Sequence, residues 1–589
     1  MKRARESFLP KNVIKASSIH IDVKKYFNRM KTNHYILLLI ALFVYSSCSD
    51  ALIEEPASYY KKENFFISPA NAEMSIIGIY DVFAKLQHYG QFEMAMPSSD
   101  DTYYIQGTGT DNTRRDISHY TLTSTNQWIE QIWNYKYQGL DRANFAVSGI
   151  ESMDAYLSDT PDQKLTQLVA EAKFLRAFLS FDLVKYWGDV PYKTAYSGDY
   201  ESAYGARVSR ELIYDQIIND LNFAKENLPW ADVNTSPERA TQGAARGLLM
   251  RVLLQRAGYS LQMDGVSTRP DDAKRQEYFN AVIDEWEAIQ QNGYHDFFNG
   301  GYLELFKGFS AGTINSRESL FEISFYSADG SSEDSGNWGT YNGPLVAAPN
   351  VPASETLNYM GRANAFFRAV PEWKGFFENS DIRRDVMVCT YQYKWNSTTA
   401  SHVKTENSNK RDWYPGKWRR EWMPLGYKDP NNTDVNYCPL RYADVVLMAA
   451  EAYNEVNQTQ TAWTLLNSVR SRSGATEITS ANYADLLKAP RVYDLPFLDD
   501  TTEAGKFRTA LYWERGFELA FEGQRKFDLI RWGFLKEALL LFNENTDSKV
   551  KGNYPAGNNF IKGKHELFPI PLDEIQVNSK LEGKNNPQY

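Results

Sequence analysis

The chain has 589 residues, of which 43% are hydrophobic and 14% aromatic. That length can form one large core or several domains of about 100–200 residues each. The formal net charge of -10 argues against a nucleic-acid partner, because contacts to phosphate need clustered Lys and Arg. Three cysteines are too few for a disulfide framework, and no two have the spacing of a zinc site, although Cys389 and Cys438 could pair or stay free.

The first feature in chain order is an apolar run, YILLLIALFVY, at residues 35–45. It is too short to span a membrane, which takes about 20 residues. Lys31 precedes it, and Ser46 and Ser47 separate it from Cys48, which is the layout of a secretory signal peptide. Cys48 in this place resembles the cysteine of a bacterial lipobox, although Tyr45 stands where Leu is usual. We therefore predict a lipid anchor at Cys48; the alternative, a buried core helix, would be amphipathic.

The predicted anchor divides the chain into three parts. Residues 1–47 form an N-terminal extension and lipoprotein signal peptide. We place its true start at Met30, because residues 1–29 are basic and lack an apolar run. Residues 48–62 form a lipidated tether, and residues 63–589 are expected to form a single domain.

Helical periodicity dominates the body. Apolar residues at helical spacing predict helices over about 165–186, 209–228, 241–253 and 278–290, and again over 440–456 and 462–472. Ser209 and Thr241 are expected N-caps, because a hydroxyl there can accept a backbone N–H of the first turn. Paired antiparallel helices with short turns are the unit of helical solenoids. The predicted fold class is therefore all-α, with TPR-like helix pairs over about 70–300 and 439–535 and few short strands, of which FEISF at 321–325 is the best candidate.

A large irregular insertion is predicted at 326–438. This stretch is rich in Gly, Asn, Pro and aromatic residues and has weak periodicity. It holds six of the fourteen tryptophans, namely Trp338, Trp373, Trp395, Trp413, Trp418 and Trp422. A long irregular segment in a helical protein is usually functional or disordered, and this many aromatic residues argue against disorder.

Motifs of catalysis are weak. Gly308 to Gly312 match G-x-S-x-G, but a nucleophile at Ser310 needs a strand before it and a helix after it, and no strand–helix alternation is present. Asp100 and Asp101 could suggest a glycosidase, yet adjacent loop aspartates more often cap turns or bind hydroxyls. DPNNTD at 429–434 lacks the full pattern of a calcium loop and is interpreted as a turn. We predict no catalytic residue, no metal ligand and no cofactor.

One charge-dense segment, WERGFELAFEGQRKFDLIRW at 513–532, is predicted to be a helix. Its alternating charges could look catalytic. At helical spacing they more often form ion pairs that hold a helix in place. We favour this structural interpretation.

Several blocks together resemble the SusD/RagB family of outer-membrane nutrient-binding lipoproteins of Bacteroidetes. They are ENFF (63–66), IWNYKYQGLDRAN (132–144), EAKFLRAFLSFDLVKYWGDVPY (171–192), RATQGAARGLLMRVLL (239–254), PLRYADVVLMAAEAYNEV (439–456), ERGFELAFEGQRKFDLIRWG (514–533) and the tail FPIPLDEIQVNSKLEGKNNPQY. The tail departs from the family at Ser579, where Pro is common. The blocks cover nearly the whole mature chain in order, which makes the resemblance specific.

The resemblance implies a function as well as a fold. It implies four TPR-like helix pairs, a less regular face and a cell-surface position on the outer membrane. It also implies a partner, a SusC-like TonB-dependent transporter, to which the lipoprotein delivers an oligosaccharide as a lid. Two alternatives remain: the same importer role with a peptide or other nutrient as ligand, and a surface glycosidase or esterase using Asp101 or Ser310.

Ligand residues of this family lie in variable loops, so they carry over poorly. A sugar site needs exposed aromatic rings for stacking and a few polar groups for orientation. On that basis the candidates are Asp100, Asp101, Tyr103 and Tyr104 after the opening helix, and Tyr326, Trp338 and Tyr341 in the insertion. Ordinary packing is the alternative for each. The basic stretch from Lys404 to Trp422 could suit an anionic glycan, a solvated face or a transporter contact.

Overall fold

The structure is a computed structural model that describes residues 65–95, 99–105, 109–327, 332–425, 431–493 and 501–589. The chain divides into two units, residues 1–61 and 62–589, and the second unit holds all the described residues. The predicted signal segment 1–47, Cys48 and the tether 48–62 lie outside the described residues, so the division of the chain at Cys48 stays a prediction.

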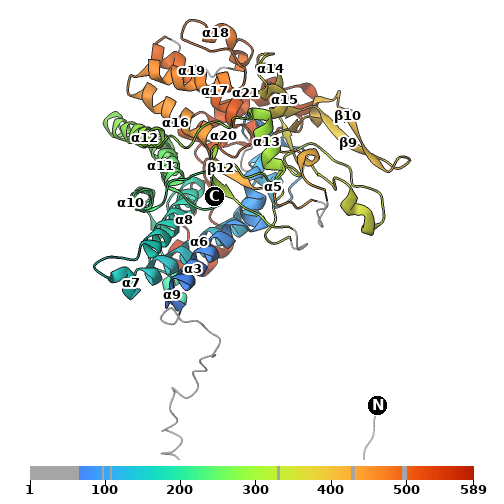
Figure 1. Ribbon diagram of the computed structural model, residues 1–589. Coiled ribbons are helices and arrows are strands. Elements are labelled where there is room, and N and C mark those ends of the chain that lie inside the picture. Colours follow the sequence, from blue (N-terminus) through green and yellow to red (C-terminus); the bar gives the residue numbers. More distant parts are fainter. Residues whose placement is uncertain (1–64, 96–98, 106–108, 328–331, 426–430, 494–500) are drawn as a thin grey trace, which may run out of the picture. The chain divides into compact units, whose positions relative to one another are not determined.

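Helices form most of the described body (Figure 1). Before the insertion they are α3 (Pro69–Phe83), α4 (Phe92–Ala95), α5 (Arg114–His119), α6 (Gln127–Ile150), α8 (Gln163–Trp187), α10 (Arg210–Asn227), α11 (Gln242–Ala257) and α12 (Asp272–Asn292). After it come α16 (Tyr442–Glu455), α17 (Thr459–Arg472), α19 (Glu503–Leu519), α20 (Arg525–Arg531) and α21 (Leu535–Asn545).

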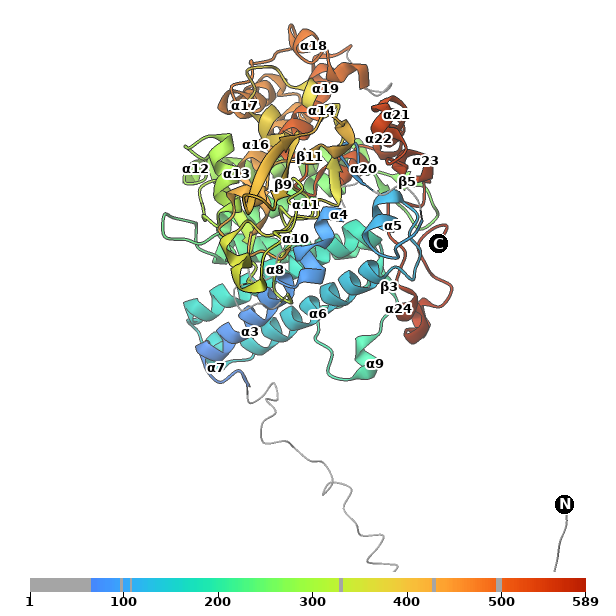
Figure 2. The same ribbon diagram turned by 90° about the vertical axis from the view of Figure 1, so that its right-hand side faces the viewer.

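Helices that follow one another in the chain pack against one another. The contacts run from α6 to α8, α10, α11 and α12, then across the insertion to α16 and α17. Figures 1 and 2 show these helices side by side in two perpendicular views. Neighbour-to-neighbour packing of this kind is the arrangement of a helical solenoid. It confirms the predicted all-α class with TPR-like pairs.

The predicted caps stand at the helix ends. The Ser209 hydroxyl accepts the N–H of Glu211 (3.3 Å), and the Thr241 hydroxyl accepts the N–H of Ala244 (3.2 Å). Gly188 ends α8 with a φ of +72°, a backbone conformation that glycine adopts without strain. The helix expected at 278–290 is longer, because Asp271 caps it and α12 begins six residues earlier, at Asp272.

Short elements fill the chain between α12 and α16, which contains the predicted insertion 326–438 and, before it, α13 and β6. They are α13 (Tyr302–Ser310), β6 (Ser319–Ile323), β7 (Phe367–Ala369), α14 (Trp373–Phe376), α15 (Arg383–Met387), β8 (Val388–Cys389), β9 (Tyr391–Asn396), β10 (Ser401–Glu406), β11 (Tyr414–Pro415) and β12 (Tyr437–Arg441). Strand β6, the expected FEISF strand, pairs antiparallel with β12 and so closes the base of the insertion. Strands β9 and β10 form a hairpin. Cys389 and Cys438 are both buried and free.

The segment 513–532 is not one helix. Helix α19 ends at Leu519 and α20 begins at Arg525, with Phe521 (φ +68°) and Gly523 (φ +86°) in the turn between them. Positive φ at two positions cannot continue a right-handed helix, so the chain changes direction there. The predicted single helix is corrected to two.

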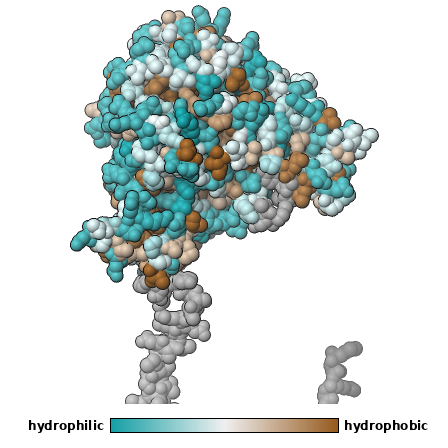
Figure 3. Space-filling model, in the orientation of Figure 1, coloured by the Kyte–Doolittle hydropathy of each residue, from teal (hydrophilic) through white to brown (hydrophobic). Residues whose placement is uncertain are grey.

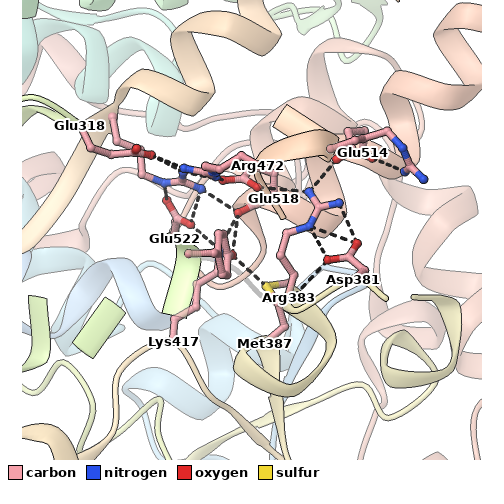
Figure 4. Close-up of polar contacts among 12 residues, drawn as sticks. Glu318, Asp381, Arg383, Met387, Lys417, Arg472, Glu514, Glu518 and Glu522 are labelled. Atoms are coloured by element: carbon pink, nitrogen blue, oxygen red, sulfur yellow. Dashed lines mark hydrogen bonds and ion pairs between the residues drawn. The ribbon is translucent and has the colours of Figure 1, made fainter. Parts of the chain in front are cut away.

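The charges of this segment do form ion pairs, as predicted, and their partners come from other elements (Figure 4). The Glu518 carboxylate accepts from Arg441 (2.6 Å), Arg383 (3.1 Å) and Arg472. Burial alone would raise the pKa of Glu518, but the three guanidinium groups and Lys417 lower it to about 2. The network joins α19 to the insertion and to α17.

The surface in the view of Figure 3 is mainly hydrophilic, with apolar residues scattered over it. Among the helices of the described part, none has the length and apolar character required to cross a bilayer.

Candidate functional site

Four predicted ligand residues lie inside the protein. Asp100, Asp101, Tyr103 and Trp338 are each at most 2% exposed. The Asp100 carboxylate accepts from the Arg525 guanidinium (2.7 and 2.9 Å). The Asp101 carboxylate accepts from Ser99 Oγ (2.7 Å) and the Phe521 N–H (3.1 Å).

This burial corrects the expected place of these four residues at the surface. Asp100 and Asp101 hold the turn after α19, and burial together with the Asp100 charge raises the pKa of Asp101 to about 6. The Trp338 indole donates to the Tyr89 carbonyl (3.1 Å) and stacks on Tyr437 (ring centroids 4.4 Å apart). None of the four offers a face to a ligand, so we leave them out of the candidate site.

Two other predicted residues, Tyr104 and Tyr341, meet around one cation. The Arg114 guanidinium carbon lies 5.8 Å from the ring centroid of Tyr104 and 5.7 Å from that of Tyr341. It also lies 4.1 Å from the centroid of Phe366 and 5.8 Å from that of Trp128. We call these five residues the Arg114 cluster. Tyr104 was also expected at the surface, but it is 2% exposed and forms the floor with the buried Trp128, while Arg114, Tyr341 and Phe366 are half-buried.

Backbone pairing assembles the cluster. Strand β1 (Thr102–Tyr104) pairs antiparallel with β7, so that Tyr104 stands opposite Phe367 and stacks on Phe366 (6.0 Å). The Phe367 N–H donates to the Tyr341 carbonyl (3.0 Å), which sets the Tyr341 ring edge-on to Phe366 (4.8 Å). Arg114 begins α5, which packs on β1, and Trp128 belongs to α6.

Arg114 has no counter-charge within the described part of the chain. No ion pair or hydrogen bond joins its side chain to another described residue, and its Nε is enclosed without an acceptor. The nearby carboxylate of Asp111 accepts the N–H groups of Thr113 (2.9 Å) and Arg115 (3.1 Å). That of Asp116 accepts the N–H of Asn112 (2.8 Å).

A second group of half-buried rings stands on the β9–β10 hairpin. Trp395 of β9 meets His402 of β10 (5.0 Å) and Tyr359 (5.0 Å), both edge-on. Tyr359 and Phe366 lie in one short segment, which at about 3.3 Å per residue can span at most about 23 Å. The segment therefore joins the hairpin rings to the Arg114 cluster.

Tyr326 stands apart from both groups. Its side chain is 55% exposed and makes no ring contact with the Arg114 cluster. Its role as a ligand contact stays a prediction.

The basic stretch Lys404–Trp422 is exposed over much of its first half and buried over residues 414–420. Lys417, Arg419 and Arg420 are buried, and the Lys417 ammonium pairs with Glu522. Lys404, Lys410 and Arg411 remain exposed. Half of the positive charge that suggested an anionic glycan here is therefore buried inside the protein.

The structure does not support a nucleophile at Ser310. Ser310 is the last residue of α13 and is fully buried, and no strand leads into this helix. The strand–turn–helix geometry of the G-x-S-x-G motif is thus not formed. Among the described residues, no group of three or more His, Cys, Asp or Glu side chains could hold a metal ion.

The sequence missed Arg114, Trp128 and Phe366. The dipeptide Arg114-Arg115 lies close to the Tyr103-Tyr104 pair in the sequence and could have drawn attention to Arg114. Phe366 had no such signal, because only the β1–β7 pairing brings it to Tyr104.

A solenoid of paired helices that carries an irregular face with clustered half-buried rings defines a TPR-like binding scaffold. Comparison with known proteins identifies the family within this class of binding scaffolds. The model of the SusD family matches residues 317–589, and a model described as starch-binding and associating with the outer membrane matches residues 58–254. The chain belongs to the SusD/RagB family.

Individual relatives match over nearly their full length. The SusD-like protein P25 of Formosa agariphila is 24% identical over 94% of this chain and 98% of its own. A SusD homologue of Bacteroides thetaiotaomicron superposes with a TM-score of 0.74 at 27% identity, over 90% of this chain and 98% of the homologue. Surface glycan-binding protein A of the same organism, solved in complex with laminarihexaose, superposes with a TM-score of 0.63 at 19% identity, over 88% and 99% of the two chains.

Proposed function

We propose that this protein captures an oligosaccharide at the cell surface and binds it at the Arg114 cluster without changing it. The observation that carries the proposal is the pair of half-buried rings, Tyr341 and Phe366, beside a guanidinium that has no hydrogen-bond or ion-pair partner among the described residues. Rings of this kind stack on the C–H faces of a sugar, and a guanidinium offers several donors to its oxygens. The structural neighbour solved with laminarihexaose supports a glycan as the ligand class.

The proposal includes delivery to an importer. The predicted lipid anchor at Cys48 would tether the protein to the outer face of the outer membrane. There it would act as a lid on a SusC-like TonB-dependent transporter. Family membership and the family model's description of outer-membrane association support this part of the proposal.

A binding experiment tests the site. The purified chain is screened on a glycan array and a peptide array, and its best ligand is titrated by calorimetry. We expect binding to at least one glycan class, and a loss of affinity of about tenfold or more in Tyr341→Ala, because stacking area disappears. Trp230→Ala is the matched control: Trp230 is also half-buried beside an arginine, Arg246 (5.5 Å), far from the cluster in sequence.

The outcomes separate the alternatives. Binding to peptides and to no glycan would replace the oligosaccharide by a peptide ligand. Turnover of a bound glycan that Ser310→Ala or Asp101→Asn abolishes would establish a hydrolase instead. Equal losses in Tyr341→Ala and Trp230→Ala would move the site away from the Arg114 cluster.

A further inference from the structure

The charge of the Arg114 cluster sets the class of glycan that it selects. The cluster places one guanidinium against four aromatic rings and against no carboxylate among the described residues. Two fully buried arginines, Arg383 and Arg441, contrast with it. Arg383 pairs with Asp381, Glu514 and Glu518, and Arg441 pairs with Glu318, Glu518 and Glu522.

The rings do not replace a counter-ion. A cation over an aromatic face gains some attraction, but the ring leaves the N–H donors of the guanidinium without acceptors. Arg114 Nε is enclosed and has no acceptor, while the side chain as a whole is only half-buried, so part of it stays accessible. The donors of a guanidinium fit the two oxygens of a carboxylate or sulfate in a planar fork.

Further positive charge lies close to the cluster. Arg115 follows Arg114 in α5, and Arg362 is exposed and donates to Asn431 (3.0 Å). Asn431 in turn accepts from Thr340, the neighbour of Tyr341. The two carboxylates close to Arg114 in the sequence, Asp111 and Asp116, accept backbone N–H groups of their own loop. On a protein with a net charge of -10, this is a local site for an anion.

We infer that the Arg114 cluster selects anionic glycans, with a carboxylate or sulfate of the ligand paired to Arg114 and its ring faces stacked on Tyr341 and Phe366. The inference rests on the proposed function and names the ligand class of the same site. A carboxylate and a sulfate each offer at least two negatively charged oxygens that can accept from a guanidinium. Binding measurements with ligands of each kind distinguish the two groups.

The experiment compares oligosaccharides of equal length that are neutral, uronate-bearing or sulfated. Calorimetric titration of the purified chain should show at least tenfold tighter binding of one anionic series than of the neutral one. Raising the salt concentration should weaken the anionic binding and leave neutral binding unchanged. The stronger of the two anionic series identifies the acidic group.

Substitutions assign the effect to Arg114. Arg114→Gln should remove the preference for the anionic series, so that anionic binding weakens at least tenfold more than neutral binding does. Arg114→Lys should keep part of the preference, because it keeps the charge but loses the planar fork. Arg269→Gln is the matched control, since Arg269 also lies over a tyrosine ring, Tyr259 (5.1 Å), without an ion pair in the described part of the chain. It should leave both series unchanged.

Two results would overturn the inference while the proposed function stands: neutral glycans that bind as tightly as anionic ones, or an anionic preference that survives Arg114→Gln. Failure to bind any glycan would overturn the proposed function itself and this inference with it. Circular dichroism of each variant shows whether a lost affinity reflects a lost fold.

Discussion

At the scale of single residues, burial and ion pairing separate charged side chains with a structural role from those that could bind a ligand. Arg114 and Arg441 are both arginines among aromatic rings, yet Arg441 is 1% exposed and fully paired, while Arg114 is half-buried and unpaired among the described residues. An enclosed charge without a partner is costly, so it is expected where a ligand supplies the partner. Asp101 shows the opposite case, because its bonds to Ser99 and Phe521 give it a structural role.

Glu322 provides a pH test at this scale. Burial raises the pKa of Glu322 to about 7, and its Oε1 has no hydrogen-bond partner among the described residues. Between pH 4.5 and about 7 the folded state therefore binds more protons than the unfolded state, so this residue lowers stability as the pH rises. Glu322→Gln should remove that dependence. The difference in free energy of unfolding between the variant and the wild type should therefore shift in favour of the variant by on the order of 2–3 kcal/mol from pH 5 to pH 8.

Urea denaturation of the wild type and Glu322→Gln at pH 5 and pH 8 measures this difference. The comparison of the two proteins cancels the titration of all other groups. Parallel pH profiles for the two proteins would contradict the assignment of a raised pKa to Glu322.

At the scale of elements, α19 depends on its buried ion pairs. Its Glu514 and Glu518 carboxylates receive guanidinium groups from α15, β12 and α17, which lie far apart in sequence (Figure 4). Removing one partner of such a network leaves the others buried and uncompensated. The network therefore fixes where the insertion meets the helical body.

Glu518→Gln should lower the free energy of unfolding by about 3–5 kcal/mol, because Arg383, Arg441 and Arg472 lose a shared negative charge. Glu503→Gln on the same helix is the control. The Glu503 side chain is 61% exposed and contacts Lys506 and Ser480 at the surface, so its replacement should leave the free energy of unfolding nearly unchanged. Chemical denaturation measures both, and equal effects would show that burial does not govern the cost.

At the scale of the whole molecule, the proposed lid needs a tether as well as a binding face. The predicted anchor at Cys48 lies outside the described residues, and the rings of the Arg114 cluster belong to the body at 62–589. Because the two functions use different parts of the chain, anchoring and ligand binding should separate on mutation.

Cys48→Ala should abolish incorporation of labelled palmitate and release the protein from the membrane fraction of a bacterial host that processes lipoproteins. Glycan affinity should stay unchanged. Cys389→Ser is the matched control, because this buried, free thiol of the body should not affect labelling. If the Cys48→Ala protein stayed in the membrane fraction, the predicted lipid anchor at Cys48 would be contradicted.

Local patterns in the sequence determined much of this protein. Apolar periodicity and the caps Ser209 and Thr241 specified the helices and their ends, because a helix is closed by hydrogen bonds between near neighbours. The irregular composition of residues 326–438 marked the insertion, and the ordered motifs identified the family. The alternating charges around Glu518 indicated ion pairs, although their partners could not be named.

Tertiary structure alone decided the site. Whether Asp100 or Tyr341 faces solvent depends on contacts with residues hundreds of positions away, such as Arg525 for Asp100. The turn at Phe521 and Gly523 depends in the same way on the Asp101 carboxylate that holds it. A residue can contact a ligand only if long-range packing leaves its side chain exposed and without an internal partner. The periodicity of the sequence does not indicate which residues these are. The sequence therefore determined the scaffold, and only the fold separated Arg114 from the arginines that the protein pairs for itself.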